Sequence, residues 1–122
     1  MVSVVYNEED ANMHVTKLDP NAGYYVLINT FIVEPDKADE LMSVLSNATM
    51  HGMSAQPGFV SANLHVNADK TRVANYAQWR SKADVDAMMA NSEARAHMVQ
   101  AAKIATSFDP IYYDLRETHG PA

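Results

Sequence analysis

The chain alternates between two hydrophobic periods, which together predict four strands and two helical regions. Runs rich in β-branched and aromatic residues predict strands over residues 24–33, 58–67, 71–79 and 108–116. Pro110 places the last strand at a sheet edge, because proline cannot donate a ladder hydrogen bond. Between the strands, apolar residues recur every three or four positions, which is the period of a helix with one buried face.

The first predicted helix has start and stop signals. Glu34-Pro35-Asp36 opens it, because proline suits the first helical position and acidic residues favour the first turn. Gly52 and Pro57 end it. Its apolar face comprises Ala38, Leu41, Met42, Leu45 and Thr49.

The second helical region consists of two pieces. Ser81, with Asp84 three residues later, forms a variant capping box for a short helix, and Asn91 or Ser92 caps a second piece that ends near Ala105. The order of elements is then strand, helix, strand, strand, helix, strand. This order predicts the α+β class, with a ferredoxin-like βαββαβ arrangement and helices on one face of an antiparallel sheet. The bare face needs cover, for which a second copy of the chain is the simplest source.

Length and composition fit a single domain. The chain has 122 residues, of which 48% are hydrophobic and 20% charged, as in ordinary globular domains. We place this domain at residues 23–118, between an N-terminal arm of residues 1–22 and a tail of residues 119–122. A turn signal at residues 19–23 separates the arm from the domain. A deep ligand cavity in so short a chain would need help from a second subunit.

Charge and residue usage exclude several classes of partner. The net charge of −6 argues against nucleic acid and against anionic membrane surfaces, because both need a basic footprint on the protein. The chain has no cysteine, so disulfides, thiolate nucleophiles and zinc–thiolate sites are excluded. No apolar run approaches ~20 residues, and the start lacks the order of a signal peptide, so we expect a cytoplasmic protein.

Common catalytic and metal-binding motifs are absent from the sequence. Neither the His-x₃-His nor the His-Glu-x-x-His spacing of metal sites occurs, and no serine stands in a Gly-x-Ser-x-Gly turn. We therefore expect neither a metal centre nor nucleophilic catalysis. The 8 methionines stand mostly at helical spacing, which favours core filler over a ligand-binding surface.

The most distinctive polar pattern lies on the strand predicted at residues 71–79. Side chains alternate along a strand, so Asn75 and Trp79 share one face and lie about 13 Å apart at ~3.3 Å per residue. A neutral amide and an indole N–H at that separation could hold a flat aromatic ligand at both ends. A half-buried strand with a core tryptophan and a hydrogen-bonded asparagine is the alternative, and the pattern leaves both open.

The preceding strand extends this pattern across a hairpin. If residues 67–70 close a tight turn, residues of like parity pair, which places Asn63 near Asn75 and His65 near Val73. The sheet face away from the helices would then carry Ser61, Asn63, His65, Asn75 and Trp79. A lining of amides, hydroxyl, imidazole and indole suits a cavity better than a solvated surface.

Two short motifs accompany these elements. Gln56-Pro57-Gly58-Phe59 leads into the second strand, and Asn75-Tyr76-Ala77-Gln78-Trp79 ends the third. With the order of elements, they resemble the antibiotic biosynthesis monooxygenase family over residues 24–116, most closely the actinorhodin-pathway type of anthrone monooxygenase. The resemblance implies a dimeric α+β barrel, in which two sheets close face to face. It also implies a pocket in each subunit between sheet and helices.

For the anthrone type, the resemblance implies oxidation by O₂ without metal, haem or flavin, with Asn75 and Trp79 lining the pocket. We therefore expect a homodimeric, cofactor-independent monooxygenase that oxidises a polycyclic phenol or anthrone to a quinone. His65 or His97 could act as the base, since an imidazole exchanges protons near neutral pH. The residues expected to bind substrate are Asn29, Phe31, Ser61, Asn63 and Met88.

The sequence also departs from the anthrone type. Where that type has a pocket tyrosine six residues after the motif tryptophan, this chain has Val85. Asn29 resembles a strand asparagine of the haem-degrading branch of the family, and His97 lies close to the haem-ligating histidine of that branch. The helix tryptophan of that branch is replaced by Ala87-Met88-Met89. Haem binding and degradation is therefore one alternative, and a non-catalytic dimer that binds a small ligand is another.

Overall fold

A computed structural model describes residues 14–122, so the first part of the predicted N-terminal arm, residues 1–13, lies outside the described residues. Four strands form one sheet in the order β2-β3-β1-β4, with every neighbouring pair antiparallel. They are β1 Tyr25–Ile32, β2 Phe59–Val66, β3 Arg72–Trp79 and β4 Ser107–Asp114. The four predicted strands are confirmed, and β4 lies at a sheet edge as its proline indicates.

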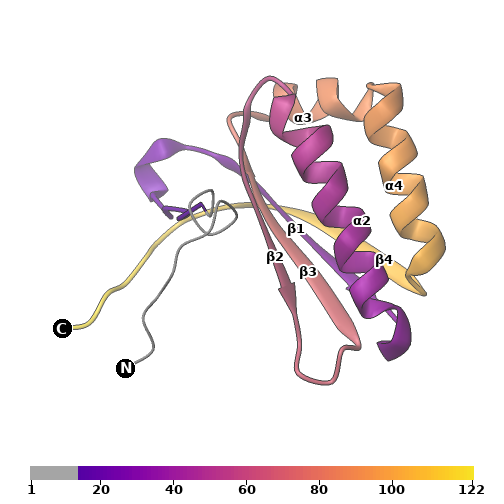
Figure 1. Cartoon of the computed structure of the whole chain (residues 1–122). Coiled ribbons are helices and arrows are strands. Elements are labelled where there is room, and N and C mark those ends of the chain that lie inside the picture. Colours follow the sequence, from indigo (N-terminus) through magenta and orange to yellow (C-terminus); the bar gives the residue numbers. More distant parts are fainter. Residues whose placement is uncertain (1–13) are drawn as a thin grey trace, which may run out of the picture.

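The helices all lie on the same side of this sheet (Figure 1). They are α2 Ala38–His51, α3 Lys82–Met89 and α4 Ser92–Ile104, with 3₁₀ turns η1 Pro20–Ala22, η2 Pro35–Lys37 and η3 Met53–Ala55. The α+β class and the ferredoxin-like βαββαβ order are thus confirmed. Closure of two such sheets into a dimeric barrel needs a second copy and stays a prediction. Within residues 14–122, no helix is long and apolar enough to cross a membrane.

Side-chain caps fix where α3 and α4 begin, as the sequence predicts. The Ser81 hydroxyl oxygen accepts from the backbone N–H of Asp84 at 3.2 Å, and the hydroxyl donates to the Asp84 carboxylate at 2.9 Å. The Asn91 carboxamide oxygen accepts from the N–H groups of Glu93 and Ala94 at 3.0 and 3.1 Å. These bonds satisfy the free donors of the first turns and set the rotation of each helix over the sheet.

The hydrophobic core divides into two clusters along the covered face of the sheet. The first comprises Phe31, Val33, Ala38, Leu41, Val73 and Ala101. The second comprises Ala77, Trp79, Val85, Met88 and Ala94. On β3, Asn75 lies between a residue of the first cluster and a residue of the second, and its cross-strand partner is Asn29. A polar pair therefore lies between the two halves of the core.

The predicted hairpin register is wrong by one residue. Asn63 pairs with Tyr76 and His65 with Ala74, so residues of unlike parity stand opposite each other. The reason is a longer turn, which closes where the Asn67 N–H donates to the Arg72 carbonyl at 3.1 Å and the Arg72 N–H donates to the Asn67 side chain at 2.8 Å. A shift of one residue moves a strand's side chains to the other face.

The register separates the predicted site residues into two groups. Asn75 and Trp79 face the helices, whereas Ser61, Asn63 and His65 lie on the opposite face of the sheet, the open face. The expectation that all five share the uncovered face is therefore wrong. The pocket position implied by the family resemblance, between sheet and helices, is the one that the structure shows.

Polar side chains of the open face bind one another and the segment that precedes β1. The Ser61 hydroxyl donates to the Gln78 side-chain oxygen at 2.9 Å, and the Gln78 amide donates to the Lys17 carbonyl at 3.3 Å. The Thr16 hydroxyl donates to the Asn63 side-chain oxygen at 2.6 Å. Ser61 and Gln78 are both almost fully buried. These bonds hold residues 16 and 17 against the sheet and give Ser61 and Asn63 a structural role.

Gly58, at the entry to β2, is a position that requires glycine. Its φ is +82°, and a Cβ built there would clash with the Asp84 side chain. Gly58→Ala is expected to lower the free energy of unfolding by more than the ~1–3 kcal/mol of backbone strain alone. Gly23→Ala is the matched control, because Gly23 also has positive φ, +68°, but its Cβ would meet open space. Equal losses in the two variants, measured by urea unfolding, would contradict the expected clash.

Candidate active site

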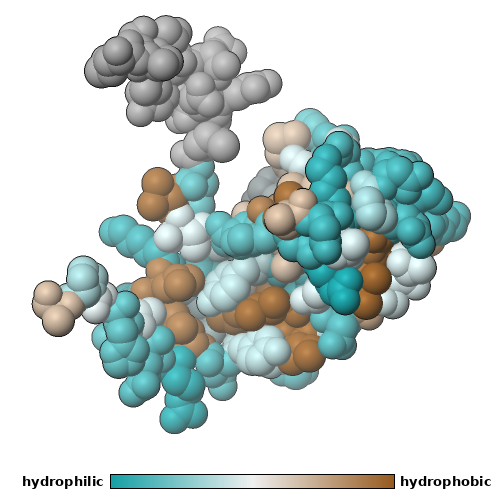
Figure 2. All heavy atoms as spheres, turned by 90° about the horizontal axis from the view of Figure 1, so that it is seen from below, coloured by the Kyte–Doolittle hydropathy of each residue, from teal (hydrophilic) through white to brown (hydrophobic). Residues whose placement is uncertain are grey.

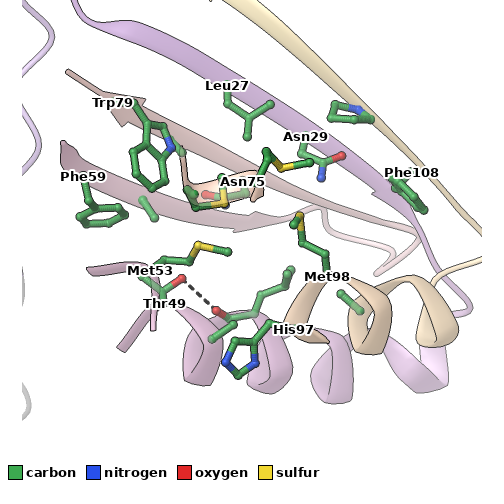
Figure 3. A pocket seen from close by; sticks show the side chains of 18 of the residues that line it. Leu27, Asn29, Thr49, Met53, Phe59, Asn75, Trp79, His97, Met98 and Phe108 are labelled. Carbon is green, nitrogen blue, oxygen red and sulfur yellow. Dashed lines mark hydrogen bonds between the residues drawn. The ribbon is translucent and has the colours of Figure 1, made fainter. Parts of the chain in front are cut away.

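A cavity of about 200 Å³ lies between the sheet and the helices, in line with the two asparagines that separate the core clusters (Figure 3). From the sheet it is lined by Leu27, Asn29, Phe31, Phe59, Ala62, Asn75, Ala77, Trp79, Phe108, Pro110 and Tyr112. From the helices and η3 it is lined by Leu45, Ala48, Thr49, Met53, Met88, Met89, His97, Met98 and Ala101. The lining is predominantly apolar with a few polar groups, which is typical of small-molecule sites.

The floor of the cavity follows from strand pairing. Ala77 stands between Asn75 and Trp79 on the helix-facing side of β3, and its neighbours across the sheet are Leu27 on β1 and Ala62 on β2. Two methyl side chains side by side leave room that larger residues would fill. The cavity therefore lies over Ala77 and Ala62, with an amide at one end and an indole at the other.

Asn29 and Asn75 are direct cross-strand partners on β1 and β3, so their Cβ atoms are about 4.5–5.5 Å apart. The side-chain oxygen of each is buried without a hydrogen-bond partner. A buried polar atom left in this state costs about 1–3 kcal/mol. Both amides therefore retain hydrogen-bonding capacity that a bound molecule can use, and Figure 3 shows the Asn29 side chain projecting into the space beneath the sheet.

Trp79 forms the other end of the floor and is only 2% exposed. Phe59 packs edge-on against its indole, with ring centroids 5.5 Å apart and an interplanar angle of 89°. This contact fixes the orientation of the indole. None of the hydrogen bonds found among residues 14–122 involves the Trp79 side chain, so its N–H is available as a donor.

His97 lines the cavity from α4, on the helix side. Its Nε2 lies against the end of α2, where a Cβ on Gly52 would come within 3.4 Å of it. Thr49, also on the helix side, has its hydroxyl engaged, because that hydroxyl donates to the Leu45 carbonyl at 2.9 Å (Figure 3). A flat molecule in the cavity would thus meet the asparagine pair on the sheet side, whereas Figure 3 shows the His97 ring directed away from the sheet.

Tyr112 of β4 is a cavity residue that the sequence reasoning missed. Its ring stacks on Tyr25, with centroids 5.0 Å apart and an interplanar angle of 19°. Partial burial raises the pKa of the Tyr112 phenol above its usual value, and Tyr25 and Asp86 nearby raise it further. The phenol is therefore neutral at physiological pH. Within residues 14–122, Tyr112 is the tyrosine that lines the cavity, whereas Val85, at the position of the anthrone type's pocket tyrosine, is buried in the core.

The structure brings most of the predicted site residues together. Those that line the cavity are Asn29, Phe31, Asn75, Trp79, Met88 and His97. Those on the open face, away from the cavity, are Ser61, Asn63 and His65. Residues missed were mostly methionine, alanine and threonine, which the sequence pattern could not distinguish from ordinary core. The cavity residues of β4 could have been found from the sequence, because side chains alternate along a strand and those on the same face as Pro110 line the cavity.

The comparisons with known proteins agree with this architecture. Residues 24–100 match the profile of the antibiotic biosynthesis monooxygenase family. The chain belongs to this family. Membership confirms the prediction of a monooxygenase at the family level, and residues 24–100 fall inside the predicted domain of residues 23–118.

One curated relative and two solved structures illustrate the similarity. Tetracenomycin-F1 monooxygenase of Streptomyces glaucescens is 35% identical over 103 residues, which are 84% of this chain and 91% of that protein. The monooxygenase ActVA-Orf6 of Streptomyces coelicolor, solved with nanaomycin D, superposes with a TM-score of 0.76 at 22% identity, over 86% of this chain and 100% of that one. SnoaB of Streptomyces nogalater, a cofactor-independent oxygenase, superposes with a TM-score of 0.69 at 22% identity, over 79% of this chain and 96% of that one.

Proposed function

We propose that this protein is a cofactor-independent monooxygenase that oxidises a polycyclic phenol or anthrone to a quinone with O₂. The observation that carries the proposal is the asparagine pair, Asn29 and Asn75, in an otherwise apolar cavity. Their buried oxygens lack partners, and none of the hydrogen bonds found among residues 14–122 uses their NH₂ groups, which can therefore donate to a bound anion. The names of the relatives support it, since tetracenomycin-F1 monooxygenase and SnoaB are both oxygenases. The described residues include no cluster of three or more His, Cys, Asp or Glu side chains that could bind a metal ion.

The chemistry balances without a further reactant. The substrate loses an acidic C–H proton to a base, and the resulting carbanion transfers one electron to O₂. The two radicals combine to form a peroxide anion, which takes up the proton to give a hydroperoxide and then eliminates water to leave the quinone carbonyl. One oxygen atom stays in the product and the other leaves as water with both hydrogens of the substrate carbon, so no external reductant is needed.

The residues of the cavity suit the deprotonation step. The amide N–H groups of Asn29 and Asn75 are neutral donors for the oxygen on which the carbanion's charge is delocalised, and the indole N–H of Trp79, at the other end of the floor, can donate to a second oxygen of the substrate. Preorganised donors in a dry site stabilise developing charge far better than they would in water. The apolar lining lowers the local dielectric around these donors, which strengthens the contacts.

His97 is the base that we propose, since it is the imidazole among residues 14–122 that lines the cavity, and the Tyr112 phenol has too high a pKa to serve. Its Nε2 lies against Gly52, so we expect the proton to reach the ring through one intervening water, a route that is open to a base but not to a haem ligand. His97→Gln is expected to lower kcat/KM about tenfold, a small effect for a general base because anthrones already ionise in water. The loss should appear in kcat and not in affinity for the quinone product, and added imidazole should restore part of it. An unchanged kcat, or a loss of product affinity alone, would exclude His97 as the base.

The exposed residues of β4 support the predicted homodimer. Ile111 and Tyr113 lie on the open face with 42% and 46% of their surface exposed, next to β1. Figure 2, in which the molecule is seen from below, shows hydrophobic residues exposed side by side in the middle of that view. The segment before β1 covers the polar part of this face over β2 and β3, and Val26 at the start of β1 is also buried, which leaves the exposed side chains of β4 for a second copy.

The dimer can be tested with charges placed on β4. The double variant Ile111→Lys, Tyr113→Lys is expected to elute as a monomer, whereas the native chain should show twice the chain mass in light scattering. Val99→Lys is the control, because Val99 is 54% exposed on α4, away from the open face. A native chain that is monomeric at micromolar concentration would rule out the proposed dimer.

The haem alternative fits the geometry poorly. Asn29 and His97 do line the same cavity, but the His97 Nε2 lies against Gly52 rather than facing open space. A haem ligand needs its ring nitrogen directed at the iron. Added haemin is therefore expected to give no shifted Soret band. A shift that disappears in His97→Ala would restore the alternative.

The deciding experiment is turnover of an anthrone by the pure protein in air-saturated buffer. Quinone absorbance should rise faster than in buffer alone, and labelled O₂ should place one labelled atom in the quinone. Several anthrones that bind but do not react would instead identify the non-catalytic binding dimer. Several that neither bind nor react would exclude this substrate class.

A further inference from the structure

Methionine is concentrated around the cavity. Of the chain's 8 methionines, those that line it are Met53, Met88, Met89 and Met98. Met53 and Met98 also pack against the core cluster that contains Ala77 and Trp79. Figure 3 shows both thioethers between the helices and the sheet, on the side towards which Asn29 and Asn75 face. Thioether sulfur is thus the most easily oxidised group in the wall opposite the asparagine pair.

We propose that Met53 and Met98 are sites of oxidation by organic hydroperoxides formed or bound in this cavity. The inference rests on the proposed function for its physiological oxidant, since the oxygenation passes through a hydroperoxide of the substrate. When that hydroperoxide persists in the cavity before it loses water, a thioether attacks its outer oxygen. The O–O bond breaks, sulfur is oxidised by two electrons to the sulfoxide, and the hydroperoxide is reduced to the alcohol.

Oxidation at these positions limits the working life of the protein. A sulfoxide is polar, whereas the wall around Met53 and Met98 is apolar and packs against the second core cluster. A polar group placed there without a partner destabilises the packing and weakens binding of an apolar ring system. Turnover should therefore inactivate the protein progressively, in proportion to the number of catalytic cycles.

Met50, near the end of α2, provides an internal reference for oxidation from bulk solvent. It is 60% exposed, whereas Met53 and Met98 are only partly exposed, and it does not line the cavity. An oxidant that attacks from bulk solvent oxidises Met50 first, because exposure sets the order. An oxidant that reacts from within the cavity reverses this order.

The test uses the full chain, cumene hydroperoxide as an aromatic hydroperoxide that fits an apolar cavity, and hydrogen peroxide as the bulk control. Peptide mass spectrometry should show a several-fold excess of sulfoxide at Met53 and Met98 over Met50 with cumene hydroperoxide, and the opposite order with hydrogen peroxide. During anthrone turnover with catalase present, the same excess should appear and grow with product. The double variant Met53→Leu, Met98→Leu should complete several-fold more cycles before inactivation.

The outcomes separate this inference from the proposed function. Sulfoxide at Met50 that equals or exceeds that at Met53 and Met98 with cumene hydroperoxide, or none at any of the three, overturns the inference even if anthrones are oxidised. If no anthrone reacts but cumene hydroperoxide still gives the reversed order, the sites stand and the proposed function fails.

Discussion

Replacing Asn75 by alanine is expected to lower kcat/KM for an anthrone by roughly 10²–10³-fold, as loss of one preorganised donor does in other enzymes that stabilise an oxyanion. The side chain contributes little to stability, because its oxygen is buried without a hydrogen-bond partner. Its removal should therefore leave the melting temperature nearly unchanged or raised. The measurement is steady-state quinone formation, together with thermal unfolding of the same preparation.

Asn29→Ala should behave in the same way, and the double variant should lose less than the product of the two single effects. Adjacent residues that act on one group are not additive. Asn63→Ala is the matched control, because this asparagine lies on the open face and its hydrogen bonds are structural. A decrease in kcat/KM for Asn63→Ala equal to that for Asn75→Ala would mean that the cavity is not the active site.

Ala77→Leu is expected to abolish most turnover of three-ring substrates, with kcat/KM reduced by roughly 10²-fold through misplacement of the rings. A leucine there would fill the floor between Asn75 and Trp79, where the native methyl group leaves space. The cost in folding free energy should stay below the ~1–3 kcal/mol of an overpacked core, because the cavity accepts the extra atoms. Calorimetric titration of the quinone product should show the matching loss of affinity.

Ala74→Leu is the control for this substitution. Ala74 lies on the same strand but on the open face, opposite His65. Ala74→Leu should retain native affinity and turnover. In Ala77→Leu, single-ring phenols should lose less affinity than three-ring quinones. Unchanged affinity of Ala77→Leu for the larger ligand would show that the substrate does not lie across this floor.

Much of the fold could be predicted from the sequence because local signals agreed with the tertiary arrangement. The caps at Ser81 and Asn91 and the strand runs gave element order, and element order gave the ferredoxin-like sheet. The hairpin register could not be predicted in the same way. The register changes when the turn is one residue longer or shorter. The Asn67 side chain that closes the longer turn is polar, so the hydrophobic pattern does not reveal the length of the turn.

The site followed the register in both its correct and its incorrect parts. Asn75 and Trp79 lie on one strand, four residues apart, so they share a face in any register of the neighbouring strands and were predicted correctly to do so. Asn63 and His65 depended on the hairpin and were assigned to the wrong face. That Asn29 stands directly opposite Asn75 follows from the pairing of β1 with β3, which no local pattern specifies.

The single tryptophan of the chain stands in the cavity wall, and this has a practical consequence. Light absorbed at the red edge of the protein spectrum excites one indole only, at the place where the rings of a ligand would rest. Intrinsic emission thus reports occupancy of that place without a label, in anaerobic solution as readily as in air. Stopped-flow recording can then time the arrival of a ligand separately from its reaction with oxygen.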